Sequence, residues 1–470
     1  MTDILWLSIA EASDLLRSGD ISSTELTRAT LERIEASEPA VHAYAGVMAE
    51  SATRDAQRAD VELAAGGSRG PLHGIPVGVK DLCFTAGFPT SAGSRVLEGF
   101  VPSYDAAVVG KLRGAGAVIV GKTVTHEFAY GQDVPPTRNA WDHACYPGGS
   151  SAGSGVAVAV GSAFGAIGTD TGGSIRAPAA VNGVVGLKPT YGRVSRKGVF
   201  PMSPTLDTVG PLTRTVQDCA LMLAAIAGRD GASDVWALDE PVPDYVASLS
   251  AGLEGVSVGI ERDYFFYDAV AEEVRSAVEA AIATLASLGA NIVEITIDGL
   301  ELSVAAGMPV LLADTSEWHQ RLLRRQSSDY VRETRVMLEL GELVSATAYV
   351  RAQRVRATVQ QGLRDAFDRH GLDAVLAPTL PLTTMPVEAL SVDLTGDGQT
   401  ALSTFIHHCF IANVVGVPAL SVPVGFSPAG LPIGMQLFGR PFGEAALFRI
   451  GHAYQGATDW HNRHPALVPS

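Results

Sequence analysis

Short β-branched runs that alternate with helical patterns across glycine-rich turns are the feature that most constrains the fold of this chain. After Pro71, the runs IPVGVK (75–80) and VVGLKPT (184–190) are apolar, and DAAVVGKLRGAG (105–116) between them has the pattern of a helix. Further strand-like segments occur near the end of the chain, at 373–379, 419–426 and 434–439. Such alternation is typical of a layered α/β protein with a buried sheet.

The first part of the chain, residues 1–65, is expected to be a helical N-terminal segment. Gly19 and Pro39 are expected to end its two clearest helices. Hydroxyl side chains that can accept hydrogen bonds from a first helical turn precede both patterns, namely Ser8 and either Ser22 or Ser23.

The strongest amphipathic helical pattern lies at 268–289, where valine and isoleucine recur at four-residue spacing and Gly289 can end the helix. A strand is expected at 291–297, and residues 316–367 are again helical in pattern. Because the chain has no internal repeat, low-complexity tract or clear linker, we expect one large domain.

We divide this single domain, residues 1–470, into three parts. The N-terminal helical segment is followed by a catalytic core at 70–215. Residues 216–470 are expected to contribute a helical insert region and to complete the sheet.

Composition excludes several classes of function. Hydrophobic residues make up 47% of the chain and charged residues 18%, which supports a large buried core and argues against disorder. The formal charge of −16 argues against nucleic acids and anionic membrane surfaces as partners, because both carry negative charge.

The expected location is the cytoplasm. The four cysteines lie far apart without C-x-x-C spacing, which favours free thiols in a reducing compartment over structural zinc or disulfides. The N-terminal stretch lacks the basic region of a signal peptide, and no apolar run approaches the ~18 residues of a transmembrane helix.

Two glycine-serine loops lie close together, PGGSSAGS at 147–154 and TDTGGSIR at 169–176. A serine hydroxyl attacks a carbonyl only when a base removes its proton and hydrogen-bond donors stabilise the oxyanion. The paired glycines of the second loop let the backbone turn sharply just before Ser174, the predicted nucleophile. The N–H groups expected to form the oxyanion hole are those of Thr171, Gly172 and Gly173.

The base is expected to be Lys80. None of the eleven histidines lies in a loop of the required kind. Lys80 ends the apolar run HGIPVGVK, and burial there would lower its pKa because desolvation disfavours the ammonium. The alternative is a lysine at the end of a strand that extends its amine to water.

These segments closely resemble the amidase signature family. The resemblance rests on GIPVGVKD (74–81), on PGGSSAGS, and on GTDTGGSIRAPAAVNGVVGLKPTYGRVS (168–195), and it extends through 207–221 to the C-terminal strand-like segments. It implies one large α/β/α layered domain, with a mixed twisted central sheet covered by helices.

The resemblance also implies a Ser–Ser–Lys triad. Lys80 matches the base, Ser174 the nucleophile, and Ser150 the bridging serine that follows a cis peptide bond. Ser150 would pass protons between Ser174 and Lys80, and water would hydrolyse the acyl-enzyme by the reverse route. Such chemistry needs no metal and no cofactor.

Further residues are expected to support the site. Asp170 and Arg176 flank the nucleophile and are predicted to form an ion pair that holds its loop, with direct substrate contact as the alternative. Ser151 is either a hydrogen-bonding residue of the site or a plain turn residue.

The substrate pocket is expected near Phe128, Tyr130 and Gln132, where family members line the acyl pocket; core packing is the alternative for Phe128. Many family members have a longer segment after EFAYG (127–131) than the QDVP of this chain. A shorter loop would widen the cleft and favour bulky or aromatic groups.

Three other functions compete with this prediction. The G-x-S-x-G pattern at 149–153, centred on Ser151, is that of an α/β-hydrolase esterase, but the preceding WDHACYP is not strand-like. A second alternative is the glutaminase-type subunit of a tRNA-dependent amidotransferase, in which the position of Ile406 would be acidic. A scaffold without activity fits poorly with a complete triad.

The predicted function is therefore that of a serine amidohydrolase acting on a small-molecule substrate. Small or aromatic carboxylic amides are the expected substrates, and the same triad can cleave anilides, esters and carbamates. The sequence is compatible with a homo-oligomer.

Overall fold

One mixed sheet of eleven strands forms the centre of the computed structural model, which describes residues 4–130, 134–231, 234–390 and 401–466, apart from the side chains of 401–406. The strand order is β1-β3-β2-β4-β6-β5-β10-β11-β9-β7-β8. The strands are β1 (Tyr44–Val47), β2 (Pro76–Lys80), β3 (Val118–Thr123), β4 (Gly165–Asp170), β5 (Val185–Lys188), β6 (Thr208–Thr213), β7 (Ser257–Glu261), β8 (Asn291–Ile295), β9 (Ala374–Pro378), β10 (Ala419–Phe426) and β11 (Pro432–Phe438).

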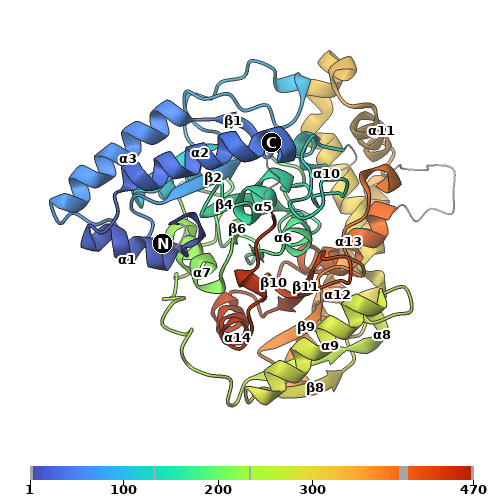
Figure 1. Ribbon diagram of the computed structural model, residues 1–470. Coiled ribbons are helices and arrows are strands. Elements are labelled where there is room, and N and C mark those ends of the chain that lie inside the picture. Colours follow the sequence, from blue (N-terminus) through green and yellow to red (C-terminus); the bar gives the residue numbers. More distant parts are fainter. Residues whose placement is uncertain (1–3, 131–133, 232–233, 391–400, 467–470) are drawn as a thin grey trace.

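Helices surround this sheet (Figure 1). Their bounds are α1 (Ile9–Ser18), α2 (Ser23–Val41), α3 (Ala49–Ala64), α4 (Ala107–Gly114), α5 (Ala152–Ala159), α6 (Arg176–Asn182), α7 (Val216–Ile226), α8 (Arg262–Phe265), α9 (Glu272–Ser287), α10 (Ser303–Gln326), α11 (Arg332–Gly341), α12 (Ala346–His370), α13 (Ala401–Val415) and α14 (Glu444–Gly456). None of the helices in the described ranges is both long and apolar enough to cross a bilayer.

The two faces of the sheet bury different helices, because successive strand residues point to opposite sides. Ala166 of β4 belongs to the same buried apolar cluster as Val156 of α5, whereas Ile167 belongs to the cluster of Met222 of α7. Parallel pairs such as β2–β4 and antiparallel pairs such as β4–β6 occur in the same sheet. This mixed, helix-covered sheet confirms the predicted fold class.

The N-terminal segment is helical as predicted, with two differences. Ser8 and Ser22 cap α1 and α2. Pro39, however, lies inside α2, which continues to Val41. The second difference is the strand β1, which follows α2 and pairs with β3. Strand β1 forms because it pairs with β3, which lies far along the chain, so the local sequence around β1 does not predict it.

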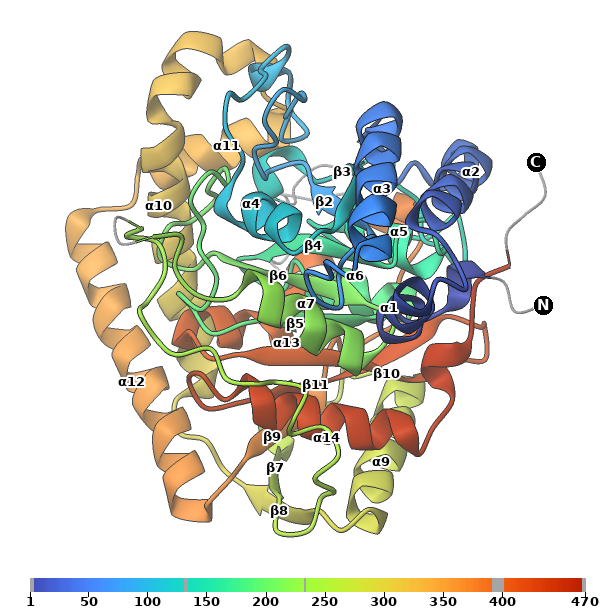
Figure 2. The same ribbon diagram turned by 90° about the vertical axis from the view of Figure 1, so that its left-hand side faces the viewer.

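The C-terminal half also follows the predicted pattern, with shifted boundaries. The amphipathic helix is α9, and the strand after it is β8. The long helical region begins earlier than predicted, at Ser303, and is divided into α10, α11 and α12. In Figure 2 these helices lie to one side of the sheet, away from α1 and α2.

The sheet order explains where a site can form. Strand β2 lies between β3 and β4 and runs parallel to both. Lys80 is the last residue of β2 and Asp170 the last residue of β4, so both lie where the carboxyl ends of these parallel strands meet. The carboxyl ends of parallel strands commonly carry ligand-binding and catalytic groups.

Candidate active site

Lys80 is fully buried, and its amine is surrounded by hydroxyl groups. Its Nζ donates to Ser150 Oγ at 2.8 Å, to Ser151 Oγ at 2.9 Å and to Thr169 Oγ1 at 2.8 Å. Burial lowers the pKa of Lys80 to about 7, because the ammonium loses its hydration, although Cys83, Asp170 and Asp207 act in the opposite direction.

A neutral amine at this position has one lone pair and accepts a proton from one hydroxyl. The Ser151 hydroxyl is already committed, because it donates to the Thr169 carbonyl oxygen at 3.1 Å. The hydroxyls of Ser150 and Thr169, each 2.8 Å from Nζ, remain able to donate to neutral Lys80.

The first glycine-serine loop leads directly into α5 and contains a cis peptide bond between Gly149 and Ser150, as the family resemblance implies. A Cβ at Gly149 would lie 2.2 Å from Nε2 of His126, so a larger residue does not fit. Ser151 N–H donates to the Ser174 carbonyl oxygen at 3.2 Å, which joins the two loops directly.

The second loop carries Ser174 and is held from within by the carboxylate of Asp170. Gly173 N–H donates to Oδ1 of Asp170 at 2.8 Å, and Ile175 N–H donates to Oδ2 at 3.1 Å. Gly173 has φ of +119°, and a Cβ there would lie 2.6 Å from that of Cys409. Only glycine satisfies both the backbone conformation and the space at this position.

The hydrogen bond from Gly173 changes the predicted set of oxyanion donors. Since its N–H is directed to Asp170, it is not free to point at a substrate. Within the described residues, the N–H groups of Thr171 and Gly172 have no such acceptor, and the same holds for Ser174 itself. The donors available for an oxyanion are therefore Thr171, Gly172 and Ser174.

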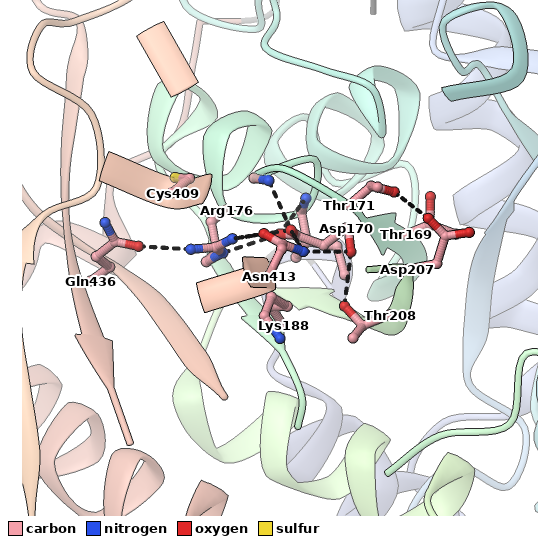
Figure 3. A network of polar contacts seen from close by, with 12 residues as sticks. Thr169, Asp170, Thr171, Arg176, Lys188, Asp207, Thr208, Cys409, Asn413 and Gln436 are labelled. Carbon is pink, nitrogen blue, oxygen red and sulfur yellow. Dashed lines mark hydrogen bonds and ion pairs between the residues drawn. The ribbon is translucent and has the colours of Figure 1, made fainter. Parts of the chain in front are cut away.

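The predicted ion pair between Asp170 and Arg176 is present (Figure 3), and both side chains are completely buried. Arg176 donates through Nε to Oδ2 at 3.1 Å and through its second terminal nitrogen to Oδ1 at 3.0 Å. Burial acts to raise the pKa of Asp170, but the adjacent Arg176 outweighs it and lowers the pKa to about 2. The carboxylate is thus charged throughout the neutral range.

Two amide side chains from the C-terminal half complete this network (Figure 3). Asn413 accepts from Arg176 at 2.8 Å and donates to both the carbonyl oxygen and Oδ1 of Asp170, each at 2.9 Å. Gln436 accepts from Arg176 at 3.0 Å. Sequence reasoning missed both residues and also Thr169, because their partners lie far along the chain or in a neighbouring loop.

Two of the three predicted pocket residues, Phe128 and Tyr130, are buried. Phe128 is fully buried, with its ring centroid 4.8 Å from Phe200 and 4.5 Å from His319, which agrees with core packing. Tyr130 is buried in the same cluster. Gln132 lies outside the described residues.

A cavity of about 300 Å³ lies next to the site. It includes Thr169, whose hydroxyl contacts Lys80, and Asp207, which accepts from Thr171 Oγ1 at 2.6 Å. Its other lining residues are Leu82, Phe84, Tyr104, Arg196, Lys197, Gly198, Val199, Phe200, Pro201, Met202, Thr208, Val209, Trp236 and Trp318. Neither Phe128 nor Tyr130 lines this cavity.

The competing α/β-hydrolase arrangement does not form. No strand precedes Ser151 within residues 134–150, whereas a nucleophile elbow requires one. Ser151 is fully buried, and its hydroxyl is used by Lys80 and the Thr169 backbone. Across the described ranges, no three His, Cys, Asp or Glu side chains gather as a metal-binding group.

A family model named Amidase matches residues 25–448 of this chain. An amidase of Pseudomonas putida is 42% identical over 100% of this chain and 99% of its own. The A-type subunit of the glutamyl-tRNA(Gln) amidotransferase of Roseiflexus sp. (strain RS-1) is 41% identical over 99% of both chains. The structure of native peptide amidase from Stenotrophomonas maltophilia superposes with a TM-score of 0.86, at 33% identity over 98% of each chain.

The chain belongs to the amidase family, whose model spans nearly all of it. Its fold is that of the family's solved structures, and it is an amidohydrolase. The relatives include both amidases and amidotransferase subunits, so their names leave the substrate open.

Proposed function

We propose that this protein is a serine amidohydrolase that forms an acyl-enzyme on Ser174, with Lys80 as the base and Ser150 as the proton relay. The observation that carries the proposal is the hydrogen bond of 2.8 Å between Lys80 Nζ and Ser150 Oγ in a fully buried environment. Among the described residues no carboxylate is hydrogen-bonded to this amine, and a buried amine of this kind is able to act as a base near neutral pH.

In the proposed mechanism, neutral Lys80 takes the proton of Ser150 while Ser150 takes that of Ser174. The Ser174 oxygen attacks the amide carbon, and the N–H groups of Thr171, Gly172 and Ser174 stabilise the negative oxygen. The protons return through Ser150 to the leaving nitrogen, and the C–N bond breaks. Water then attacks the ester carbon, and its proton passes through Ser150 to Lys80. The same proton returns through Ser150 to the Ser174 oxygen as the C–O bond of the ester breaks, and the carboxylic acid is released.

The proposed substrates are small or aromatic carboxylic amides, with anilides, esters and carbamates as chemically related substrates. The proposed pathway runs through the side chains described above and requires no metal ion or cofactor. The Ser174 hydroxyl is the natural point of attack, because the Ser151 hydroxyl is committed to three hydrogen bonds and that of Ser150 to Lys80.

A second candidate is a glutamine-hydrolysing component of an amidotransferase, which the 41% identity to such proteins favours. Against it stands Ile406 on α13, at a position where the family resemblance implies an acidic residue to hold the ammonium of glutamine. We therefore rank the free amidase first.

The test is covalent labelling with a fluorophosphonate, followed by peptide mass spectrometry. The adduct is expected on Ser174, and Ser174→Ala should lose both labelling and hydrolysis of a chromogenic anilide. Ser154→Ala is a matched control from the other loop, since its buried hydroxyl contacts Thr123 and the Ile167 carbonyl oxygen. An adduct on Ser151, or full activity of Ser174→Ala, would contradict the proposal.

A further inference from the structure

The cavity next to the site is lined on several sides by aromatic rings. The aromatic lining residues are Phe84, Tyr104, Phe200, Trp236 and Trp318. Its volume of about 300 Å³ is at the small end of the ~300–1,000 Å³ typical of small-molecule sites, which suits a single ring with short substituents.

The cavity reaches the catalytic groups through three polar residues. Thr169 contacts Lys80, Thr208 donates to the Asp170 carbonyl oxygen at 3.0 Å, and Asp207 accepts from Thr171. Figure 3 shows Thr169, Asp207 and Thr208 on the same side of the nucleophile loop. A group bound in the cavity would therefore lie beside residues that contact Lys80 and the nucleophile loop.

The charged side chains of the lining already have partners. Arg196 donates to the Pro204 carbonyl oxygen at 2.7 Å, and its guanidinium lies 5.3 Å from the Trp236 ring centroid. Lys197 pairs with Asp230 at 2.8 Å. With Asp207 held by Thr171 and two backbone N–H groups, none of these charges needs a charged ligand.

Two of the rings are left largely exposed to solvent. Tyr104 is 50% exposed and Trp318 is 40% exposed, although both line the cavity. When a flat apolar group covers such exposed rings, apolar surface is removed from water, which makes binding more favourable. Trp318 is supplied by α10 and Tyr104 by the loop before α4, so their separate elements frame the cavity.

We propose that this cavity binds an uncharged aromatic ring of the substrate and that Trp318 determines the preference for it. This inference rests on the proposed function, because it assigns a substrate class to the same site. The lining of this cavity does not include Phe128 and Tyr130, the residues expected from the sequence.

The first experiment compares benzamide and acetanilide, which carry the ring on the acyl side and the amine side, with the small aliphatic propionamide. The quantity compared is kcat/KM for an aryl substrate divided by kcat/KM for propionamide. For at least one of the two aryl substrates, Trp318→Ala should lower this ratio at least tenfold, chiefly by raising KM for the aryl substrate. Trp318→Phe should retain the ratio within about threefold, because it keeps a ring. Trp460→Ala, a tryptophan change outside the lining, is the matched control.

The second experiment measures binding without turnover. Ser174→Ala is titrated with benzamide and acetanilide by calorimetry, with and without Trp318→Ala. Binding that depends on Trp318 supports the cavity, even if Ser174→Ala still hydrolyses amides and the proposed function fails. If Ser174→Ala abolishes hydrolysis but Trp318→Ala changes neither the kcat/KM ratio nor the affinity for the aryl amides, the cavity assignment is wrong and the proposed function stands.

Discussion

At the scale of single residues, two of the buried lysines, Lys80 and Lys122, differ in their partners. Lys122 is buried beside the carboxylate of Asp81 at 2.9 Å, which balances a positive charge. Lys80 has three hydroxyl groups and, among the described residues, no carboxylate within hydrogen-bonding distance. Hydroxyls orient an amine without neutralising its charge, so burial can keep Lys80 unprotonated near neutral pH.

The pH dependence of hydrolysis should report this state. Below a pKa of about 7, Lys80 carries a proton and has no lone pair, so the rate should fall as pH decreases through 7 and level off above it. Lys80→Ala should lower kcat by roughly 10²–10⁴-fold and flatten the acid limb. Lys80→Arg should fail equally, because a guanidinium stays protonated.

The measurement is a pH–rate profile with one anilide. Ser154→Ala serves as the control and should keep the wild-type acid limb, since its hydroxyl contacts Thr123 and the Ile167 backbone rather than Lys80. Near-normal activity of Lys80→Ala with an unchanged limb would mean that another group is the base.

At the scale of elements, the C-terminal half supports a loop that lies in the N-terminal half. Helix α13 supplies Asn413 and strand β11 supplies Gln436, and both contact the Asp170–Arg176 pair. A buried ion pair is costly unless its remaining hydrogen-bonding capacity is satisfied. The side chains of Asn413 and Gln436 provide these hydrogen bonds, and they connect the nucleophile loop to the C-terminal half.

Asn413→Ala should therefore destabilise the protein and lower its activity together. It removes an acceptor from Arg176 and two hydrogen bonds to Asp170, so the free energy of unfolding should fall by about 2–4 kcal/mol. Asn291→Ala is the matched control, because this exposed amide makes a long hydrogen bond to Ser257 and should cost under about 0.5 kcal/mol. Urea unfolding of both variants measures the difference, and equal effects would contradict the role assigned to Asn413.

At the scale of the whole molecule, one sheet connects distant parts of the chain at the site. Strand β5 pairs with β6 on one side and with β10 on the other, so the sheet continues from the catalytic strands to the C-terminal strands. The proposed triad comes entirely from β2, the loop before α5 and the loop after β4. The chain therefore contains every group that the proposed mechanism uses.

The purified chain should hydrolyse an aryl amide in the presence of a chelator and without any partner protein. It should release little ammonia from glutamine, because Ile406 occupies the position implied for an acidic residue. A coupled ammonia assay with glutamine and benzamide, with and without EDTA, makes the comparison. Efficient glutaminase activity without aryl amidase activity would favour the amidotransferase function, and activity restored only by a divalent ion would contradict the proposed chemistry.

The sequence by itself was enough to predict much of the fold and of the site. Helix caps such as Ser8 and the amphipathic pattern of α9 are local features, because they depend on residues within a turn or two. The alternation of strands and helices predicted the layered α/β class for the same reason. Lys80 and Ser174 could be selected because the lysine within an apolar run and the glycines before the serine are visible without a fold, whereas Ser150 was identified only through the resemblance to the amidase signature family.

Only the tertiary structure decided the rest. Strand β1 forms because β3 pairs with it, and the Gly173 N–H is occupied because Asp170 turns back toward it. The aromatic cavity gathers residues from far apart in the chain, Phe84 and Trp318 among them, and its walls have no common local pattern. Pairing, packing and burial between such distant residues depend on where the whole sheet brings them, and no short stretch of sequence carries that information.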